Sequence, residues 1–261
     1  MAKETRDLAP AVTRAIVVLE ALARASRPLA LSELATMARL PKSSVHGLCS
    51  SLLAGGLVER REDGTYALGL HIVDLANARL GQNDLAQEFL RFWSRHPEFS
   101  KEAAVMSERV GKDVVYLACR NSNRPLGVTF RVGMRLPAVV TATGKAILST
   151  LDDDEINRLY KLKSAIEPLT NRSVRTLPEL KRQLKEVRRN GYSIDNGETR
   201  EGMCSFGAAV LARSGKVAVA GVALSFFRAE LDDRRAKAAI AAIKELALHL
   251  SEKAARLNPG E

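Results

Sequence analysis

The sequence predicts an α+β protein of two domains: an N-terminal winged helix-turn-helix, then a linker helix and a larger domain in which helices flank one sheet. Residues 31–68 follow the order helix, turn, helix and two-stranded hairpin. Farther along the chain, β-rich segments alternate with amphipathic helical segments. With 261 residues, 46% of them hydrophobic, the chain can build a small domain and one of about 170 residues. We expect the bounds 8–68 for the winged helix, 69–83 for the linker and 84–257 for the second domain.

The first expected helix, over residues 13–25, is a scaffold helix. Its apolar stripe at helical spacing consists of Val12, Ala15, Ile16, Leu19, Leu22 and Ala23. Ser32 stands where the N-cap of a short second helix is expected, just before Glu33. Arg39 and Leu40 then form the turn of the helix pair.

The third helix, over residues 41–54, is the candidate recognition helix. Pro41 suits its first turn, where the missing N–H would have had no partner. Free N–H groups at a helix start suit a phosphate oxygen, and short hydroxyls reach phosphates or base edges in a major groove. The alternative is a solvated face rich in serine. The candidate DNA-binding residues are Ser32 at the start of the second helix and, on the third helix, Lys42, Ser43, Ser44, His46, Gly47 and Ser50.

A hairpin directly after this helix favours the DNA interpretation. Residues 58–60 and 65–68 alternate like half-buried strands, and Asp63-Gly64 offers the positive-φ turn of a tight hairpin. Arg60 and Arg61 would lie where such a wing meets the phosphate backbone.

The net charge of the chain is not what indicates DNA binding. Residues 1–81 hold 10 basic and 8 acidic side chains, net +2, against 30 and 22, net +8, for residues 82–261. A few positioned cations, doubled in a dimer, suffice for a small reader domain.

The rest of the chain reads as a linker and an α+β domain. Residues 69–80 form the expected linker helix, and residues 85–93 a helix with an aromatic cluster around Trp93, which we interpret as core rather than as a ligand contact. Strands are expected at 114–118, 126–130, 208–212 and 217–224. The capping box Thr176–Glu179 starts a helix that ends at Gly191, and the last helix spans residues 232–257.

Several functional classes are disfavoured. The TATGKAIL segment lacks the upstream glycine and the magnesium-binding hydroxyl of a phosphate loop, and no GxSxG elbow is present. Asp195 and Glu198 resemble a catalytic pair, but a turn rich in Asp, Asn and Gly explains them equally well. Three scattered cysteines and four scattered histidines favour reduced thiols and no metal site. We expect no enzyme activity and no cofactor.

The location of the protein follows from the same sequence. No apolar run approaches the roughly 20 residues of a membrane span, and the start MAKETRDLAP is charged. We expect a cytoplasmic protein without membrane contact.

Several motifs, taken in order, resemble the IclR family of bacterial transcription regulators over nearly the whole chain. They are Leu40–His46 in the third helix, Asp63–Gly69 in the wing, the segments Val132–Pro137 and Thr141–Ala146, Arg188–Tyr192, and Glu198 with Gly202. The resemblance implies a winged helix-turn-helix, a linker helix and a GAF-like effector-binding domain. It also implies homodimers that often pair into tetramers.

The resemblance further implies a small organic acid or related metabolite, held between the sheet and the helix of the TA-x-GKA motif. If that helix starts near Gly144, after Ala142 and Thr143, its N-terminal amides favour a carboxylate and the Thr143 hydroxyl adds a donor. The alternative is that these are ordinary core and turn residues. By resemblance the pocket also includes Val128, Leu136, Asp195, Ser205, Ala223 and Ser225.

The chain departs from the family pattern at four positions. Gly47 replaces the usual arginine after the histidine, and a helical glycine costs about 1 kcal/mol relative to alanine. Ser205 aligns with a usual pocket cysteine, Val139 replaces a common histidine and Ala223 a common serine. The pocket is therefore expected to be less polar than usual, and a ligand with a short apolar stem, or a lactone or aldehyde, is our hypothesis.

The sequence thus predicts a regulator, more specifically a repressor, that binds double-stranded operator DNA and responds to a small carboxylate, lactone or aldehyde. The alternative is a sensor or interaction protein whose winged helix binds a protein partner.

Overall fold

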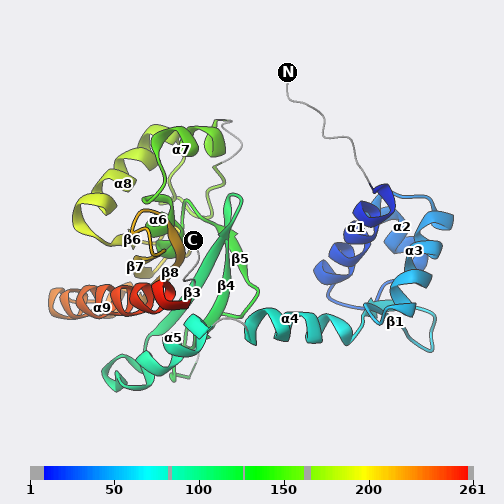
Figure 1. Ribbon diagram of the computed structural model, residues 1–261, viewed down its shortest axis with the longest axis horizontal. Helices are drawn as coiled ribbons and strands as arrows, with labels where there is room; N and C mark the ends of the chain where they lie inside the picture. The colour runs from blue at the N-terminus through cyan, green and yellow to red at the C-terminus, as the bar shows by residue number, and fades with distance from the viewer. Residues whose placement is uncertain (1–8, 82–83, 126, 162–165, 258–261) are drawn as a thin grey trace. The chain divides into compact units, whose positions relative to one another are not determined.

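The computed structural model describes residues 9–81, 84–125, 127–161 and 166–257. The chain divides into two compact units, Met1–Gln82 and Asn83–Glu261; Figure 1 labels the elements of both. Among the described residues, no helix has the length and apolar character needed to cross a membrane.

The N-terminal unit is a winged helix-turn-helix, which confirms the predicted fold class. Arg39, in the left-handed region with φ 54°, makes the turn of the helix pair. Gly64, with φ 80°, turns the wing hairpin. Leu29 forms an antiparallel bridge with Tyr66 and ties the hairpin to the segment before the second helix. The elements are α1 Pro10–Arg24, α2 Leu31–Ala38, α3 Lys42–Ala54, β1 Val58–Arg60, β2 Tyr66–Leu68 and α4 His71–Gly81.

One local prediction for this unit is wrong in part and another is wrong. Of the predicted apolar stripe of α1, Leu22 is buried and Ala15 and Leu19 pack against the same core, whereas Val12 and Ile16 are 59% and 51% exposed and Ala23 is also exposed. The buried face also includes Val18 and Ala21, which were not predicted. This helix has apolar residues on two faces, so periodicity alone did not determine which face packs on α2 and α3.

Ser32 is not an N-cap. Ala30 occupies the cap of α2, and the Glu33 carboxylate accepts its N–H at 2.8 Å. The guanidinium of Arg27 donates to the same carboxylate at 2.6 Å, which holds the side chain in place. Ser32 is an exposed residue of the first turn.

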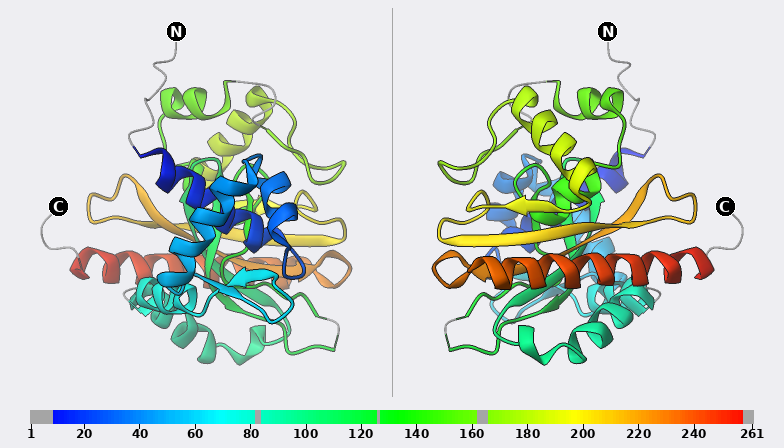
Figure 2. Two further views of the ribbon diagram at one scale, coloured as in Figure 1. Left: turned by 90° about the vertical axis from the view of Figure 1, so that its right-hand side faces the viewer. Right: turned by 90° about the vertical axis from the view of Figure 1, so that its left-hand side faces the viewer.

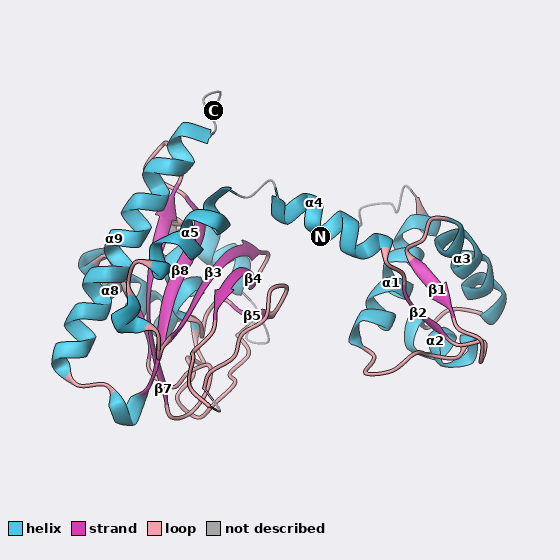
Figure 3. Ribbon diagram, turned by 90° about the horizontal axis from the view of Figure 1, so that it is seen from below, coloured by secondary structure: helices cyan, strands magenta, loops and turns pink. Residues whose placement is uncertain are grey.

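The C-terminal unit is built on one antiparallel sheet of six strands in the order β5-β4-β3-β8-β7-β6. Figure 3 shows these strands in magenta between helices. Their bounds are β3 Ala103–Val110, β4 Asp113–Arg120, β5 Arg135–Pro137, β6 Ser193–Asp195, β7 Met203–Leu211 and β8 Ala218–Phe227.

Helices cover both faces of this sheet, and each face has its own apolar core. One core joins the sheet to α5 Asp84–Ser94, the short helix η1 Pro97–Phe99 and the long α9 Asp233–Leu257. Figure 2 shows α9 lying alongside the strands of the sheet. The other core joins it to α6 Ala142–Leu148, α7 Asp153–Tyr160 and α8 Leu177–Asn190. A further short helix, η3 Arg228–Glu230, follows β8. The predicted helices at 177–190 and 232–257 and the core position of Trp93 are confirmed.

The strand predicted at 126–130 is wrong: residues 127–130 form a loop, and Leu126 lies outside the described residues. The central strand β3, the short β5 and β6, and α7 were not predicted. The inner half of β3 is buried on both faces, so it lacks the alternation that marks a half-exposed strand.

Candidate functional site: an effector cavity and a DNA interface

Helix α6 starts two residues before the predicted position. Its N-cap is Thr141, whose Oγ1 accepts the Gly144 N–H at 3.0 Å, so Ala142 and Thr143 lie in the first turn rather than before it. Gly144 packs directly on the backbone of Ala138, where an added Cβ would lie 2.2 Å from the carbonyl oxygen. Gly144 therefore allows α6 to lie close to the preceding segment.

A cavity of about 240 Å³ lies between the start of α6 and the sheet. Of the nine predicted effector-binding residues, Gly144 does not line it, and the other eight do: Val128, Leu136, Ala142, Thr143, Asp195, Ser205, Ala223 and Ser225. The structure thus brings these eight together from segments far apart in the sequence. That they bind an effector stays a prediction.

The polar floor of the cavity is a row of three residues on neighbouring strands. Asp195 of β6 pairs with Ser205 of β7, which pairs in turn with Ser225 of β8. The two serine Oγ atoms lie 2.9 Å apart, within hydrogen-bond distance. Since each serine hydroxyl is both a donor and an acceptor, these two residues can hydrogen-bond to a ligand atom that donates or to one that accepts.

Asp195 has a second role in the loop that follows it. Its Oδ1 accepts the N–H groups of Glu198 and Thr199, at 2.7 and 3.2 Å, so the turn interpretation of this segment is confirmed. Burial raises the pKa of the Asp195 carboxyl, against the opposing effects of these hydrogen bonds and of Lys145. Burial therefore makes this carboxyl costly to ionise.

Two further residues of the cavity lining are polar. The Oγ1 of Thr143 is buried and has no hydrogen-bond partner within the described residues. Arg200, an exposed residue, also lines the cavity, and its guanidinium is an always-charged donor of the kind that matches a carboxylate. Beyond these, the walls are largely apolar, formed by residues such as Val105, Phe130 and Met203.

An ion pair lies behind the cavity wall and fixes α6 to the loop. The Nζ of Lys145 donates to the Ile194 carbonyl at 2.7 Å and to Oε1 of Glu198 in a short contact. Both charged side chains are buried, with Lys145 1% and Glu198 5% exposed. Ser173 Oγ donates to the Glu198 carbonyl at 2.6 Å and holds the loop from outside. Lys145 is thus a structural residue rather than a phosphate-loop lysine.

Sequence reasoning missed half of the cavity lining. Tyr116, inside the predicted strand 114–118, and Met203, two residues before Ser205 on β7, could have been found from strand alternation, whereas Val105 lies on β3, which shows none. Residues from loops gave no such signal. The lining residues that were not predicted are Val105, Tyr116, Thr129, Phe130, Met134, Thr141, Thr199, Arg200 and Met203.

The candidate DNA interface is the exposed face of α3. Val45, Cys49 and Leu52 are buried against α1 and α2, and this orientation leaves the opposite face in solvent. Of the candidate residues on this helix, Ser44 is half-buried and the remaining five are exposed: Lys42, Ser43, His46, Gly47 and Ser50.

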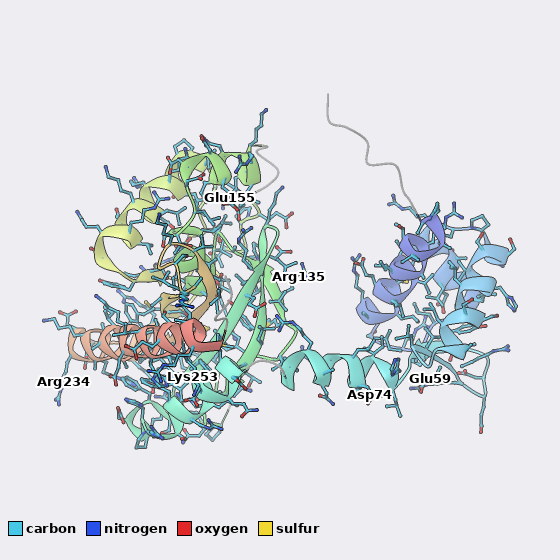
Figure 4. The ribbon with its side chains drawn as sticks, in the orientation of Figure 1. Glu59, Asp74, Arg135, Glu155, Arg234 and Lys253 are labelled. Carbon is cyan, nitrogen blue, oxygen red and sulfur yellow. The ribbon has the colours of Figure 1, made fainter. Side chains whose placement is uncertain are left out.

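The wing holds two arginines but also three acids. Arg61 Nε lies 3.7 Å from the carboxylate of Glu59, which is labelled in Figure 4. The guanidinium of Arg60 lies 5.8 Å from the centre of the Tyr66 ring. Hydrogen bonds from Thr65 lower the pKa of Asp63 at the wing tip. The acids of the wing therefore offset the positive charge of its two arginines.

Two family models match the chain. The model described as "Bacterial transcriptional regulator IclR C-terminal" matches residues 77–252, and that of the "IclR helix-turn-helix domain" matches residues 11–62. The chain belongs to the IclR family. Members of this family are transcriptional regulators rather than enzymes, so this protein is a DNA-binding transcription regulator and the prediction of no enzyme activity is confirmed.

Individual relatives agree with this assignment. The crystal structure of the repressor BlcR of Agrobacterium tumefaciens is 39% identical in sequence, with 96% of this chain and 99% of that chain covered and a TM-score of 0.61. The HTH-type transcriptional regulator KipR of Bacillus subtilis is 27% identical over 228 residues, 86% of this chain and 89% of KipR. An IclR homolog of Microbacterium hydrocarbonoxydans, solved in complex with 4-hydroxybenzoate, shares the fold at 19% identity, with a TM-score of 0.79 and coverage of 94% and 98%.

Proposed function

We propose that this IclR-family regulator is a repressor whose affinity for operator DNA changes when a small organic acid or related metabolite binds the cavity beside α6. The observation that supports this most directly is that one cavity of about 240 Å³ is lined both by Thr143, whose buried hydroxyl has no partner in the described residues, and by Arg200, whose side chain ends in a guanidinium. Both groups favour an oxygen-rich, anionic ligand head.

The relatives support the two finer parts of this proposal. BlcR, at 39% identity, is a repressor. The Microbacterium homolog has a carboxylate compound as its ligand. Together, these two relatives support a repressor that responds to a carboxylate.

The largely apolar walls also suit a second class of ligand. A lactone or an aldehyde with a short apolar stem would contact these walls and use the Ser205–Ser225 floor for its oxygen, without needing a cation. The two classes therefore differ in their dependence on Arg200.

Arg200→Gln distinguishes them. Calorimetric titration of the wild type with a panel of short carboxylates, lactones and aldehydes identifies a ligand. A carboxylate ligand is expected to lose tenfold or more in affinity in Arg200→Gln, whereas a neutral ligand loses little. Thr143→Val, which removes the hydroxyl and keeps the volume, should weaken binding of either class. A panel in which nothing binds would contradict the effector part of the proposal.

We also propose that the regulator acts as a homodimer, which can pair into a dimer of dimers. Exposed apolar side chains on α1 and at the start of α4, among them Val12, Ile16, Leu70 and Val73, support self-association. A winged helix that reads a two-fold symmetric operator needs two copies. Light scattering coupled to size-exclusion chromatography tests this, and a monomer at micromolar concentration would contradict it.

The link between the two sites is a difference in affinity. A ligand changes operator binding only to the extent that it binds the DNA-competent and DNA-incompetent states differently. Titration of the ligand into a protein–operator complex, followed by fluorescence anisotropy, is therefore expected to release the DNA.

A further inference from the structure

Gly47 lies in the middle of α3, and among the described residues nothing in the fold requires a glycine there. A Cβ built at this position meets no atom within 4 Å. Gly47 is also absent from the residues with positive φ, so its backbone is open to any residue. Because glycine is a poor helix former, alanine would make α3 more stable at no packing cost. The fold therefore does not explain Gly47.

The surface around Gly47 consists of backbone and short side chains. Ser43 lies one turn before it and Ser50 and Ser51 one turn after, all exposed. The Oγ atoms of Ser50 and Ser51 donate to the carbonyl oxygens of His46 and Gly47, at 3.0 and 3.3 Å. These hydroxyls lie against their own helix, and such bonds also let a helix bend. At Gly47 the exposed surface of the helix is the backbone itself, because no side chain covers it.

A thin helix has a consequence in the major groove. The groove is about 12 Å wide, and a helix with its side chains measures about 10–12 Å across. A helix that lacks a side chain at the point of contact can therefore lie deeper and bring its neighbours nearer to the base edges.

The charges of the winged helix make this depth important. Residues 42–54 of α3 contain one lysine and no acid, whereas the wing pairs Arg61 with Glu59 and also holds Glu62 and Asp63. With two arginines against three acids, the wing over residues 58–68 has a net charge of −1. Helix α3 is therefore the element better suited to close contact with DNA, and contacts with base edges are the ones that discriminate between sequences.

We propose that Gly47 is a specificity-determining residue, which lets the backbone of α3 approach the operator so that the base pair opposite it is selected by the space available. This inference rests on the winged helix binding operator DNA. In place of a long side chain that reaches a base, Gly47 provides room for the base edge.

The test separates helix stability from DNA affinity. The probe is a duplex enriched by the full-length wild type from a random DNA pool, compared with a scrambled duplex of the same length. Gly47→Ala adds one methyl group, and Gly47→Arg restores the residue usual in the family. Gly81→Ala in α4 is the matched control, since Gly81 is also an exposed helical glycine with no atom within 4 Å of an added Cβ.

For Gly47→Ala we expect a melting temperature a few degrees higher, affinity for the enriched duplex about tenfold lower, and unchanged affinity for the scrambled duplex. Gly47→Arg is expected to bind the enriched duplex more weakly and the scrambled duplex more tightly, because it adds one positive charge. Gly81→Ala should change neither affinity.

The inference is overturned if Gly47→Ala binds the enriched duplex as tightly as the wild type does. It is also overturned if Gly47→Ala lowers the melting temperature, since Gly47 would then serve the fold. A wild type that enriches no sequence contradicts operator binding itself, which is a separate and recognisable failure.

Discussion

Loss of the buried Lys145–Glu198 ion pair should lower the free energy of unfolding of the C-terminal unit by a clearly measurable amount. Lys145→Met keeps most of the side-chain volume and removes the charge. Glu198, 5% exposed, would keep only distant partners: the amide of Gln183 at 3.5 Å and the Val174 N–H at 3.4 Å. Breaking a buried ion pair on one side typically costs about 3–5 kcal/mol, so we expect the free energy of unfolding to fall by about 3 kcal/mol or more.

The matched control removes both charges. In Lys145→Met/Glu198→Gln no buried charge is left, and the double variant is expected to recover most of the loss, to within about 1 kcal/mol of the wild type. Trp93 is the single tryptophan of the chain and lies in the core of the C-terminal unit. Its fluorescence during urea unfolding therefore reports this unit alone.

The loss should also depend on pH. Burial raises the pKa of Glu198 even beside Lys145, and without the lysine that rise should be larger. A raised folded-state pKa means that the folded protein binds the proton more readily, so stability falls as pH rises through that pKa. The cost of Lys145→Met is thus smaller in acid, and the double variant lacks this dependence. A single variant as stable as the wild type, or a double variant no better than the single one, would refute the reasoning.

Three further predictions concern the rest of the site. Gly144→Ala should destabilise the C-terminal unit by about 2 kcal/mol, because its Cβ would lie 2.2 Å from the Ala138 oxygen; a neutral result in the same urea assay would contradict the packing of α6. A carboxylate ligand should bind more weakly as pH rises through the raised pKa of Asp195, whose ionised form repels it, and calorimetry should find this dependence flattened in Asp195→Asn. The titratable groups that interact with Asp195, namely Lys145, Glu198, Tyr116 and Cys204, stay in place in that variant. Lys42→Ala should reduce the slope of log affinity against log salt by about 1 for any DNA sequence, whereas Arg61→Ala, already paired with Glu59, should reduce it less.

The winged helix could be predicted almost completely because its signals are local. Asp63-Gly64 indicates a hairpin, and Gly64 indeed turns it with a positive φ. The left-handed Arg39 gave no comparable signal, since the conformation is one that L side chains rarely adopt. The buried face of α1 could not be chosen, because apolar residues stand on both sides of that helix.

The candidate cavity could be predicted only where the motifs of the family mark it. The strand pairing that aligns Asp195, Ser205 and Ser225 is a tertiary property, and Lys145 meets Glu198 across 53 residues of sequence. Arg200 and Met134 enter from loops, where no periodicity indicates direction. The helix start at Ala142 rather than Gly144 depends on the side-chain cap of Thr141, and this segment offers two threonines as candidate caps.

The most direct test of a DNA-binding regulator is fluorescence anisotropy of the full-length protein on the DNA immediately upstream of its own gene, against scrambled DNA, over a series of salt concentrations. We expect selective binding with a steep loss of affinity as salt rises, because several phosphate contacts release counterions. Binding without selectivity, or with an affinity indifferent to salt, would contradict the account and favour a winged helix that binds a protein partner.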